Sequence, residues 1–297
     1  CIDSKFNYHI FSDDFIREDI KFLAKQTKPI MVMWHDPNFG IKFDNIMEII
    51  GSIKKPDTLK FSSEMNISRL SENRLKILHK NNFWALAPGI ESWSSFNSKV
   101  GSKTKDKLEK VYLTAEKINK ICDYIPIVQV NIIFGLDVDQ GKEPFELTKK
   151  FIKLTPRVYT NFQTITMFGN TAPLYEKYLN ENRLINIPYH MMDGFSISNV
   201  VLNEDLSQFY LYYSELVKYS KSFYVTMKRI LMVKTFSAKI LNFVRRLATD
   251  RGTKKYYREL STKLSKKEYV LYHSGKSKIV PNEYIKQIKK QLNIFMR

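Results

Sequence analysis

The sequence has little of what a disulfide framework, an exported protein or a membrane-spanning protein needs. It contains only two cysteines, Cys1 and Cys122, which fits a reducing compartment. It shows no charged-then-apolar leader, and its longest apolar stretches, such as residues 128–136, are far shorter than the roughly 20 residues of a membrane-spanning helix. We therefore expect a cytoplasmic protein.

Familiar catalytic motifs are also missing. The chain has no G-x-S-x-G nucleophile elbow, no lysine-containing phosphate loop and no G-x-G-x-x-G fingerprint. His35, His79 and His190 lie in different units, and no three imidazoles or carboxylates have the spacing of metal ligands. These absences disfavour hydrolases and nucleotide kinases.

Positive charge is concentrated in the last third of the chain. The formal net charge is +18, but residues 203–297 carry 21 Lys and Arg against 7 Asp and Glu, whereas residues 1–202 carry 27 against 23. This asymmetry predicts a nearly neutral body over residues 1–202 and a basic extension over residues 203–297.

The hydrophobic pattern of the body predicts an α/β fold. With 43% hydrophobic residues in 297, the chain can bury a substantial core. Apolar runs predict strands over residues 29–36, 58–64, 83–92, 128–137 and 161–169, and amphipathic patterns predict helices over residues 13–26, 43–53, 71–82, 105–125, 143–155 and 174–183. Five successive βα units imply a parallel sheet with right-handed crossovers. The pattern begins with a helix, as if one strand were missing, and beyond residue 203 it is helical throughout.

Polar residues follow the predicted strands, at the edge where such folds carry their chemistry. These residues are Asp36, Asn38, Glu64, Glu91, Asp137 and Asp139. Carboxylates and amides there suit a ligand with an ammonium group and ribose hydroxyls, and glycines at 40, 89, 135 and 169 let backbone approach a ligand closely. The alternative is that the acidic residues cap the following helices.

Three stretches in this order resemble the radical S-adenosylmethionine (SAM) enzymes. They are GIES at 89–92, NIIFGLD at 131–137 and GNTAPLYEKYLNENRL at 169–184, which resemble the fourth, fifth and sixth strands of that family. HDPNFG at 35–40 is similar to a motif of the branch that often carries an N-terminal cobalamin-binding domain. The resemblance implies a partial (βα) TIM-like barrel that lacks its first strand, followed by an α-helical C-terminal extension.

The resemblance also implies roles for individual residues. CIDSKFNY at 1–8 resembles the cluster loop of the family from its last cysteine onward, so Cys1 would be one ligand of a [4Fe–4S] cluster and the chain would be cut within that loop. By the same resemblance, the SAM-binding residues would be Asp36, Asn38 and Phe39 near the amino group, Glu91 and Ser92 near the carboxylate or ribose, and Ile133, Gly135 and Asp137 beside the adenine, with Glu64 on the same rim. Gly169 and Thr171 fall in a further family segment whose spacing this sequence breaks. Cys122 lies within a predicted helix and is expected to be a small buried hydrophobe.

The resemblance further implies a reaction and partners. SAM bound at the cluster would be cleaved reductively to a 5′-deoxyadenosyl radical that acts on a small-molecule or lipid-like substrate. Flavodoxin or ferredoxin would supply the electron, and cobalamin is a further candidate cofactor on a domain ahead of this sequence. With one cluster thiolate, the chain alone is expected to be inactive.

The basic extension leaves three interpretations open. Over residues 228–248, one helical face carries Val233, Phe236, Ile240, Val244 and Leu247, and Lys234, Lys239, Arg245 and Arg246 flank or oppose it. Such a helix can pack on the body with its lysines in solvent, lie on an anionic membrane, or bind RNA with aromatic residues at 209–213 and 223–224 stacked on bases. The competing hypothesis for the whole chain is therefore a non-catalytic α/β module whose basic helices bind RNA or a membrane surface.

Overall fold

A computed structural model describes residues 11–36, 39–94, 104–139, 141–166, 172–192, 194–201 and 205–295, without the side chains of residues 247–254 and 294–295. Cys1, Asn38, Gly169 and Thr171, to which the sequence assigned roles, lie outside the described residues.

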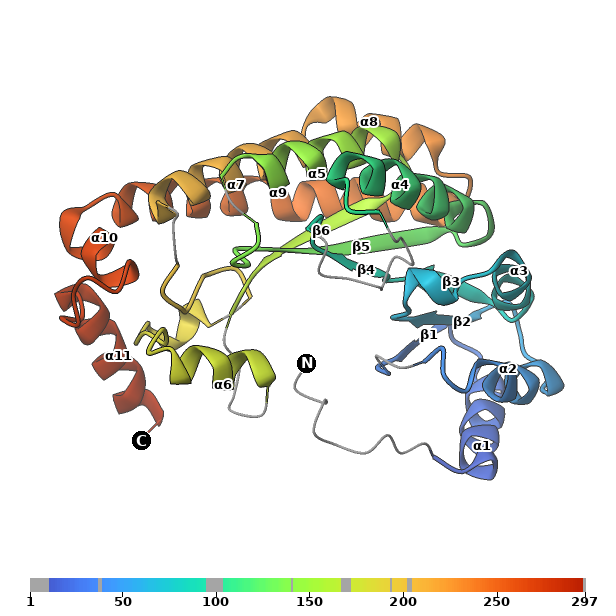
Figure 1. Ribbon diagram of the computed structural model, residues 1–297. Coiled ribbons are helices and arrows are strands. Elements are labelled where there is room, and N and C mark those ends of the chain that lie inside the picture. The colour runs from blue at the N-terminus through green and yellow to red at the C-terminus, as the bar shows by residue number, and fades with distance from the viewer. Residues whose placement is uncertain are drawn as a thin grey trace.

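A parallel sheet forms the centre of the α/β body (Figure 1). Its strands are β1 (Ile30–Trp34), β2 (Leu59–Ser63), β3 (Phe83–Leu86), β4 (Gly89–Glu91), β5 (Ile127–Phe134) and β6 (Tyr159–Thr164). All pairs are parallel, β1 with β2, β2 with β3, both β3 and β4 with β5, and β5 with β6. β3 and β4 pair one after the other along β5, and the remaining neighbours in space are consecutive strands, as the βα alternation predicts. Within the described residues β1 and β6 do not pair with each other, so closure toward a barrel stays a prediction.

The body helices lie where the amphipathic pattern predicts them. They are α1 (Asp13–Ala24), α2 (Phe43–Ser52), α3 (Glu72–Lys80), α4 (Lys107–Tyr124), α5 (Glu143–Leu154) and α6 (Pro173–Asn180), with short 3₁₀ turns at Ile67–Arg69 and Tyr189–Met191. Ser71 caps α3, because its hydroxyl accepts a hydrogen bond from the Arg74 amide at 3.3 Å. Ser12 caps α1 in the same way, since its hydroxyl accepts from the Phe15 amide at 3.3 Å.

Two strands end earlier than the apolar runs suggest. The stretch predicted as one strand over residues 83–92 is interrupted between β3 and β4 at Ala87 and Pro88, where proline has no amide hydrogen for the ladder. β5 ends at Phe134 because Gly135 takes a φ of +87°, which no extended strand allows.

The C-terminal region is helical, as predicted. Its helices are α7 (Leu206–Ser220), α8 (Phe223–Met232), α9 (Phe236–Leu264), α10 (Lys267–His273) and α11 (Asn282–Phe295). α7 packs on α5 and on α9, which places it in the helical layer over the sheet (Figure 1). Buried residues before and after residue 202 share one hydrophobic core, and the boundary at 202 stays a prediction. No helix in the described ranges is both long and apolar enough to cross a membrane.

The two faces of the sheet carry different kinds of side chain. We call the face that packs against the helices the outer face and the opposite face the inner face. The outer face carries Phe61, Val130, Ile132, Phe134 and Phe162, which are buried in the main core beneath the helices. Because side chains alternate along a strand, the inner face carries Lys60, Gln129, Asn131, Ile133, Tyr159, Asn161 and Gln163, all half-buried. The side-chain amides of β5 and β6 therefore lie on the inner face, whereas the small buried hydroxyl residues Ser63, Thr160 and Thr164 share the outer face with the phenylalanines.

Candidate functional site

The carboxyl ends of the strands bring several predicted site residues to one edge of the sheet. β1 and β2 pair as far as Trp34 and Ser63, so Asp36 and Glu64 follow neighbouring strand ends. Glu91 ends β4, and Asp137 follows the end of β5 by three residues. Asp36 is half-buried and Glu64 is exposed.

These acidic residues are not helix caps. Lys42 precedes α2, Ser71 caps α3, Asp106 caps α4, and Lys142 precedes α5. Asp106 accepts from the Leu108 and Glu109 amides at 2.7 and 3.0 Å, whereas Lys142 makes no side-chain cap. The capping alternative is thus wrong for the strand-end carboxylates, whose positions need another reason.

Glu91 has an unusual backbone that redirects its side chain. Its φ is +66°, a left-handed conformation that costs free energy in a residue with a Cβ and that recurs at functional sites. The register between β4 and β5 shifts between Gly89 and Glu91, and a Cβ on residue 89 would lie 3.7 Å from Glu91 Oε1. The Glu91 carboxylate therefore lies beside Gly89, whose register partner on β5 is Asn131 of the inner face.

Three side-chain amides on β5 and β6 form an amide cluster, composed of Gln129, Asn131 and Asn161. Asn131 Oδ1 accepts hydrogen bonds from Asn161 Nδ2 at 3.1 Å and from Gln129 Nε2 at 3.5 Å. Gln163 lies one step nearer the carboxyl edge, paired in register with Ile133. Half-buried amides supply both donors and acceptors, which suits the polar edges of a nucleoside. The period-two pattern of VQVNIIF and YTNFQT carries this signal, but reasoning from strand ends alone missed it.

The amino-terminal end of the inner face is closed by the C-terminal helices. Arg229 and Arg245 lie over the ring of Tyr159, with their guanidinium carbons 5.6 and 4.6 Å from its centroid. Burial lowers the pKa of Arg229 to about 10, and its Nε donates to the Val158 carbonyl at 2.8 Å. Beyond them, Ile127 packs against Val233 and Ala238 in a small apolar cluster. The inner face is thus covered at its amino end by residues of α8 and early α9, and its carboxyl end carries Asn131, Asn161 and Gln163.

Ser92 takes part in a buried network that joins two strand-end loops. Its hydroxyl donates to the Asp139 carboxylate, with Oγ 2.7 and 2.9 Å from the two oxygens, and Ser94 donates to the same group. Lys110 Nζ donates to the Ser92 and Ser94 carbonyls at 2.9 and 3.0 Å. Burial raises the pKa of Asp139 and lowers that of Lys110. The side chain of Ser92 is therefore engaged within the protein.

Asp137 is held by a buried arginine. Arg183, 5% exposed, donates from Nη1 and Nη2 to the two Asp137 oxygens at 2.9 and 2.5 Å, and it also donates to the Val200 carbonyl. This hydrogen-bonded pair lowers the pKa of Asp137. The Arg183 guanidinium also stacks on the ring of Tyr178, 4.1 Å from its centroid. Asp137 thus joins the end of β5 to the segment that follows α6.

Two further predicted residues lie in packed surroundings. Phe39 is fully buried, its ring 5.5 Å from Trp34 and 5.7 Å from Phe83, so only its backbone remains for a ligand. A Cβ on Gly135 would lie 2.8 Å from Ile197 Cδ1, so the space above this glycine is filled by the protein's own side chain. Ile133, by contrast, is half-buried on the inner face.

The described residues offer no metal centre. They contain no group of three His, Cys, Asp or Glu that could hold an ion. Cys122 is buried in α4, as predicted, and burial raises the pKa of its thiol to about 12. A buried neutral thiol on the core side of a helix is a packing residue and no cluster ligand.

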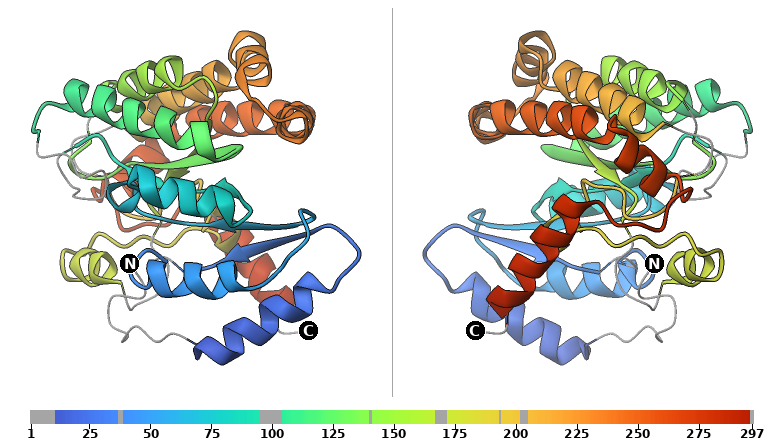
Figure 2. Two further views of the ribbon diagram at one scale, coloured as in Figure 1. Left: turned by 90° about the vertical axis from the view of Figure 1, so that its right-hand side faces the viewer. Right: turned by 90° about the vertical axis from the view of Figure 1, so that its left-hand side faces the viewer.

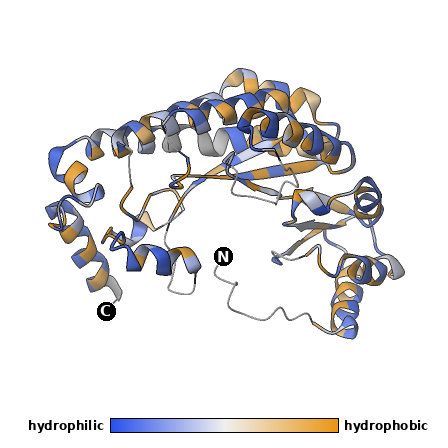
Figure 3. Ribbon diagram, viewed as in Figure 1, coloured by the Kyte–Doolittle hydropathy of each residue, from blue (hydrophilic) through white to orange (hydrophobic). Residues whose placement is uncertain are grey.

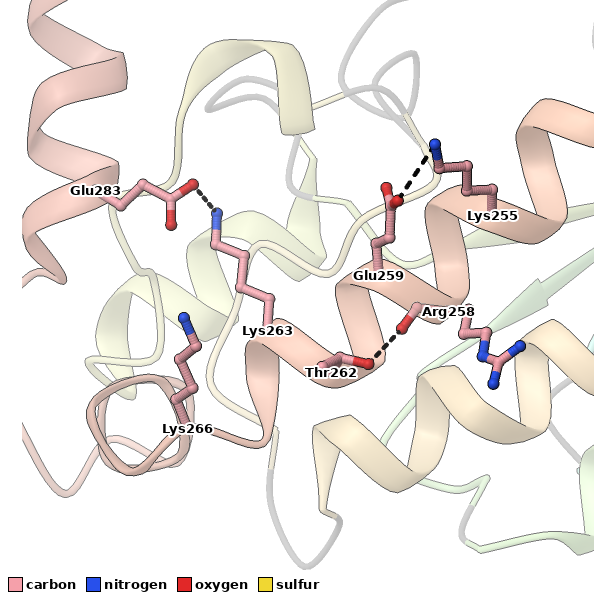
Figure 4. Close-up of a pocket in the computed structure, with 7 residues that line it drawn as sticks. All are labelled: Lys255, Arg258, Glu259, Thr262, Lys263, Lys266 and Glu283. Carbon is pink, nitrogen blue, oxygen red and sulfur yellow. Dashed lines mark hydrogen bonds and ion pairs between the residues drawn. The ribbon is translucent and has the colours of Figure 1, made fainter.

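A concavity of about 460 Å³ lies beside α9, away from the inner face, near α11 (Figure 4). Its lining residues are Lys255, Arg258, Glu259, Thr262, Lys263, Lys266 and Glu283. Lys263 is paired with Glu283 at 2.7 Å, and Lys255 lies 3.7 Å from Glu259. Since much of its charge is paired and its lining includes no imidazole or thiol, we assign no chemistry to it.

Comparisons with known proteins give two partial structural likenesses. No protein-family model matches the chain, and no curated protein matches its sequence. Coproporphyrinogen III oxidase (HemN) from Escherichia coli, a radical SAM enzyme, is 17% identical over 50% of this chain and 36% of its own, with a TM-score of 0.34. The cobalamin-dependent SAM radical enzyme OxsB, solved with aqua-cobalamin and SAM bound, is 12% identical over 97% of this chain and 52% of its own, with a TM-score of 0.41. The chain thus spans about a third and about half of these two proteins, both of the family that its motifs resemble.

Proposed function

We propose that the inner face of the sheet binds SAM at its carboxyl edge, and that the chain is the corresponding part of a radical SAM enzyme. The observation that carries the proposal is the Glu91 carboxylate, which belongs to a residue with a φ of +66° and lies beside Gly89, the register partner of Asn131 in the amide cluster. The motif resemblance and the chain-ordered parallel sheet support it.

The residues of this edge fit the chemistry of SAM. Its ammonium group needs anionic acceptors, and Glu64 after β2 and Glu91 at the end of β4 are carboxylates at the same edge of the sheet. Its ribose and adenine need mixed donors and acceptors, which the amide cluster and Gln163 offer on the inner face. Asp137 acts indirectly in this proposal, because Arg183 already occupies both of its oxygens.

The described residues do not fit a [4Fe–4S] cluster, and we derive no step through it. Such a cluster is held by several cysteine thiolates, whereas the sequence has two cysteines and Cys122 is a buried helix residue. Cys1 stays the predicted ligand, outside the described residues. Radical cleavage, cobalamin, the electron donor and the identity of the substrate likewise stay predictions from the resemblance.

Titration of the 297-residue chain with SAM tests the binding site. We expect saturable heat release, weakened about ten- to hundredfold in Glu91→Gln, because a hydrogen bond to a charged group contributes about 1.5–3 kcal/mol. Gln163→Leu should weaken binding about tenfold or less, as expected for a neutral hydrogen bond of about 0.5–1.5 kcal/mol. Glu48→Gln, an exposed carboxylate on α2, is the matched control and should bind like the parent chain. A parent chain that does not bind SAM, or variants that bind it equally well, would rule out this site.

The family assignment has its own test in the protein as the cell makes it. After anaerobic reconstitution with iron and sulfide, that protein should release 5′-deoxyadenosine and methionine from SAM. If it assembled no cluster, or left SAM intact under reduction, the radical SAM assignment would be abandoned while the SAM-binding result would stand.

A further inference from the structure

Helix α8 and the first part of α9 expose an unusual amount of apolar surface. The exposed side chains are Phe223 (67%), Tyr224 (68%), Leu231 (71%), Met232 (46%), Phe236 (76%), Ile240 (48%), Phe243 (52%) and Val244 (51%). Single exposed hydrophobic residues are ordinary, but eight within 22 residues of two packed helices exceed the usual small patches of a soluble surface. We call these eight residues the α8–α9 apolar surface.

The other side of the two helices holds them on the body. Val225, Thr226 and Arg229 of α8 are buried, as are Val233 and Ala238 around the turn into α9. Arg229 is fixed to the Val158 carbonyl, and Val233 and Ala238 pack on Ile127 of β5. The inward side of α8 and early α9 thus packs on the body, and the exposed apolar side chains lie on the side that faces away from it. The two helices lie at the edge of the molecule (Figures 1 and 3).

α8 lies at the margin of the molecule, above the helical layer, in all three views (Figures 1 and 2). Arg246 of α9 lies over the ring of Phe223 at the start of α8, 4.9 Å from its centroid, so both helices contribute to one continuous region. The interpretation that this face of α9 packs on the body does not hold for Phe236, Ile240 and Val244, which are about half or more exposed.

The charge around this surface has one sign. Residues 216–249 contain eight Lys and Arg and no Asp or Glu, and of the eight Arg229 is buried on the inward side. Within the described ranges, Asp123 of α4 pairs with this segment, 3.5 Å from Lys234, and it already pairs with Arg157 at 2.9 Å. Basic side chains around exposed apolar ones complement a surface that is anionic outside and apolar inside.

Lipid fits this combination better than RNA or a protein partner does. Aliphatic side chains are removed from water when they enter a membrane interface, and aromatic side chains are enriched at the level of the headgroups. RNA would use the aromatic rings for stacking but would leave Leu231, Met232 and Ile240 exposed. The rim of a protein interface is polar, whereas the charged residues within 216–249 are all basic, which complements an anionic surface.

We propose that the α8–α9 apolar surface docks on an anionic membrane surface, with its aromatic and aliphatic side chains in the lipid interface and its lysines and arginines at the phosphates. This surface lies at the amino-terminal end of the strands, opposite the proposed SAM edge, and it does not depend on SAM binding. Docking there would leave the carboxyl edge of the sheet open to a substrate.

Sedimentation with vesicles tests the proposal on the 297-residue chain. We expect binding to vesicles of phosphatidylcholine and phosphatidylglycerol in a 7:3 ratio, at least tenfold weaker binding to phosphatidylcholine alone, and weaker binding as salt is raised. Leu231→Ser combined with Phe236→Ser should lower binding to the mixed vesicles at least tenfold, because both side chains are more than 70% exposed and contribute little to the folded core.

Phe22→Ser is the matched control, since Phe22 is 66% exposed on α1, outside this surface. It should bind vesicles like the parent chain, and circular dichroism should show all variants folded. The proposal is overturned if the parent chain ignores anionic vesicles, if the double variant binds them equally well, or if the chain binds a single-stranded RNA and no vesicle. Size-exclusion chromatography tests whether the surface instead joins two copies of the chain. The proposal is also overturned if the double substitution dissociates a dimer and leaves vesicle binding unchanged.

Discussion

The sheet body and the C-terminal helices fill their interiors with different aromatic residues. Among the described residues, eight phenylalanines and one tyrosine are buried before residue 202, whereas one phenylalanine and six tyrosines are buried after residue 205. The phenylalanines pack between the sheet and the helices, as Phe134 stacks on Phe145 at 4.8 Å. The tyrosines pack against one another too, as Tyr210 stacks on Tyr257 at 6.1 Å, but each also brings a hydroxyl that must be satisfied.

This difference gives the two regions different sensitivities. The phenylalanine core is stabilised by apolar burial alone and should respond little to pH. The tyrosine core is stabilised partly by directed hydrogen bonds, such as Tyr210 to the Ile197 amide, Tyr272 to Asn186 and Tyr269 to Glu283. The Tyr210 and Tyr272 bonds join the helices to the segment after α6, and the Tyr269 bond joins α10 to α11.

The largest expected effect on stability comes from removing Arg183, which joins the end of β5 to the segment after α6. Arg183→Ala leaves the Val200 carbonyl without two donors and leaves Lys177, 3.6 Å away, as the remaining cation beside Asp137. The arginine side chain is only 6% exposed and the aspartate 28%, so we expect a loss near the lower end of the about 3–5 kcal/mol that breaking a buried pair costs. Urea unfolding should show this loss, whereas Lys76→Ala, which breaks an exposed pair with Glu72, should cost at most about 0.5 kcal/mol. If both variants lost the same unfolding free energy, the Arg183–Asp137 pair would contribute no more to stability than an exposed ion pair.

The next prediction concerns the pH dependence of stability, which we expect to arise in the C-terminal helices from His273. Burial lowers the pKa of His273 from 6.5 to about 4, with Lys263 adding to the shift, and its Nε2 lies 3.1 Å from the Tyr284 hydroxyl. The folded state therefore favours the neutral imidazole, and between pH 6.5 and 4 the unfolded chain binds the proton more tightly. Stability from this group is fully present above pH 6.5 and is lost as the pH falls toward 4, by at most roughly 3 kcal/mol at about 1.4 kcal/mol per pKa unit.

The measurement is the urea midpoint of the chain across this pH range. His273→Gln should flatten the decline, and His190→Gln, an exposed histidine, should leave it unchanged. If His273→Gln declined as steeply as the parent chain, the acid sensitivity would have to come from carboxylates elsewhere.

The smallest effect tests whether the tyrosine hydroxyls matter. Tyr210→Phe keeps the ring stacking but leaves the buried Ile197 amide without its acceptor at 2.8 Å, which costs about 1–3 kcal/mol. Tyr212→Phe is the control, because Tyr212 is half-buried against Phe145 and no hydroxyl bond of it is found in the described part of the chain. If Tyr210→Phe left the unfolding free energy unchanged, the tyrosine hydroxyl would contribute nothing to stability. The proposed difference between the two cores would then be wrong.

Local patterns in the sequence predicted most of the body. Alternating apolar runs and amphipathic stretches indicated each strand and helix, because strand and helix periodicities depend on nearby residues only. The breaks at Pro88 and Gly135 shortened two predicted strands. Both are local backbone effects, and a stricter reading of proline and glycine within apolar runs would have found them.

The candidate site was only partly predictable. Strand-end carboxylates were expected at one edge and lie there, but Asp137 is engaged by Arg183, 46 residues away, and nothing in the local pattern reveals that pair. Phe39 and Ser92 were expected near a ligand and have side chains packed or bonded inside the protein. The amide cluster was visible as alternating polar residues, but its contacts depend on the register between β5 and β6.

The sequence by itself determined the α/β order, the parallel direction of the strands and the basic character of the last third, since composition and periodicity are local properties. Only the tertiary structure decided which polar groups come together on the inner face and which bind residues of other segments, as Asp137 binds Arg183. It also decided that the apolar side of α8 and early α9 faces outward, because the inward side already packs on β5 and Val158. Such choices depend on long-range packing, where residues far apart in the chain compete for the same partners.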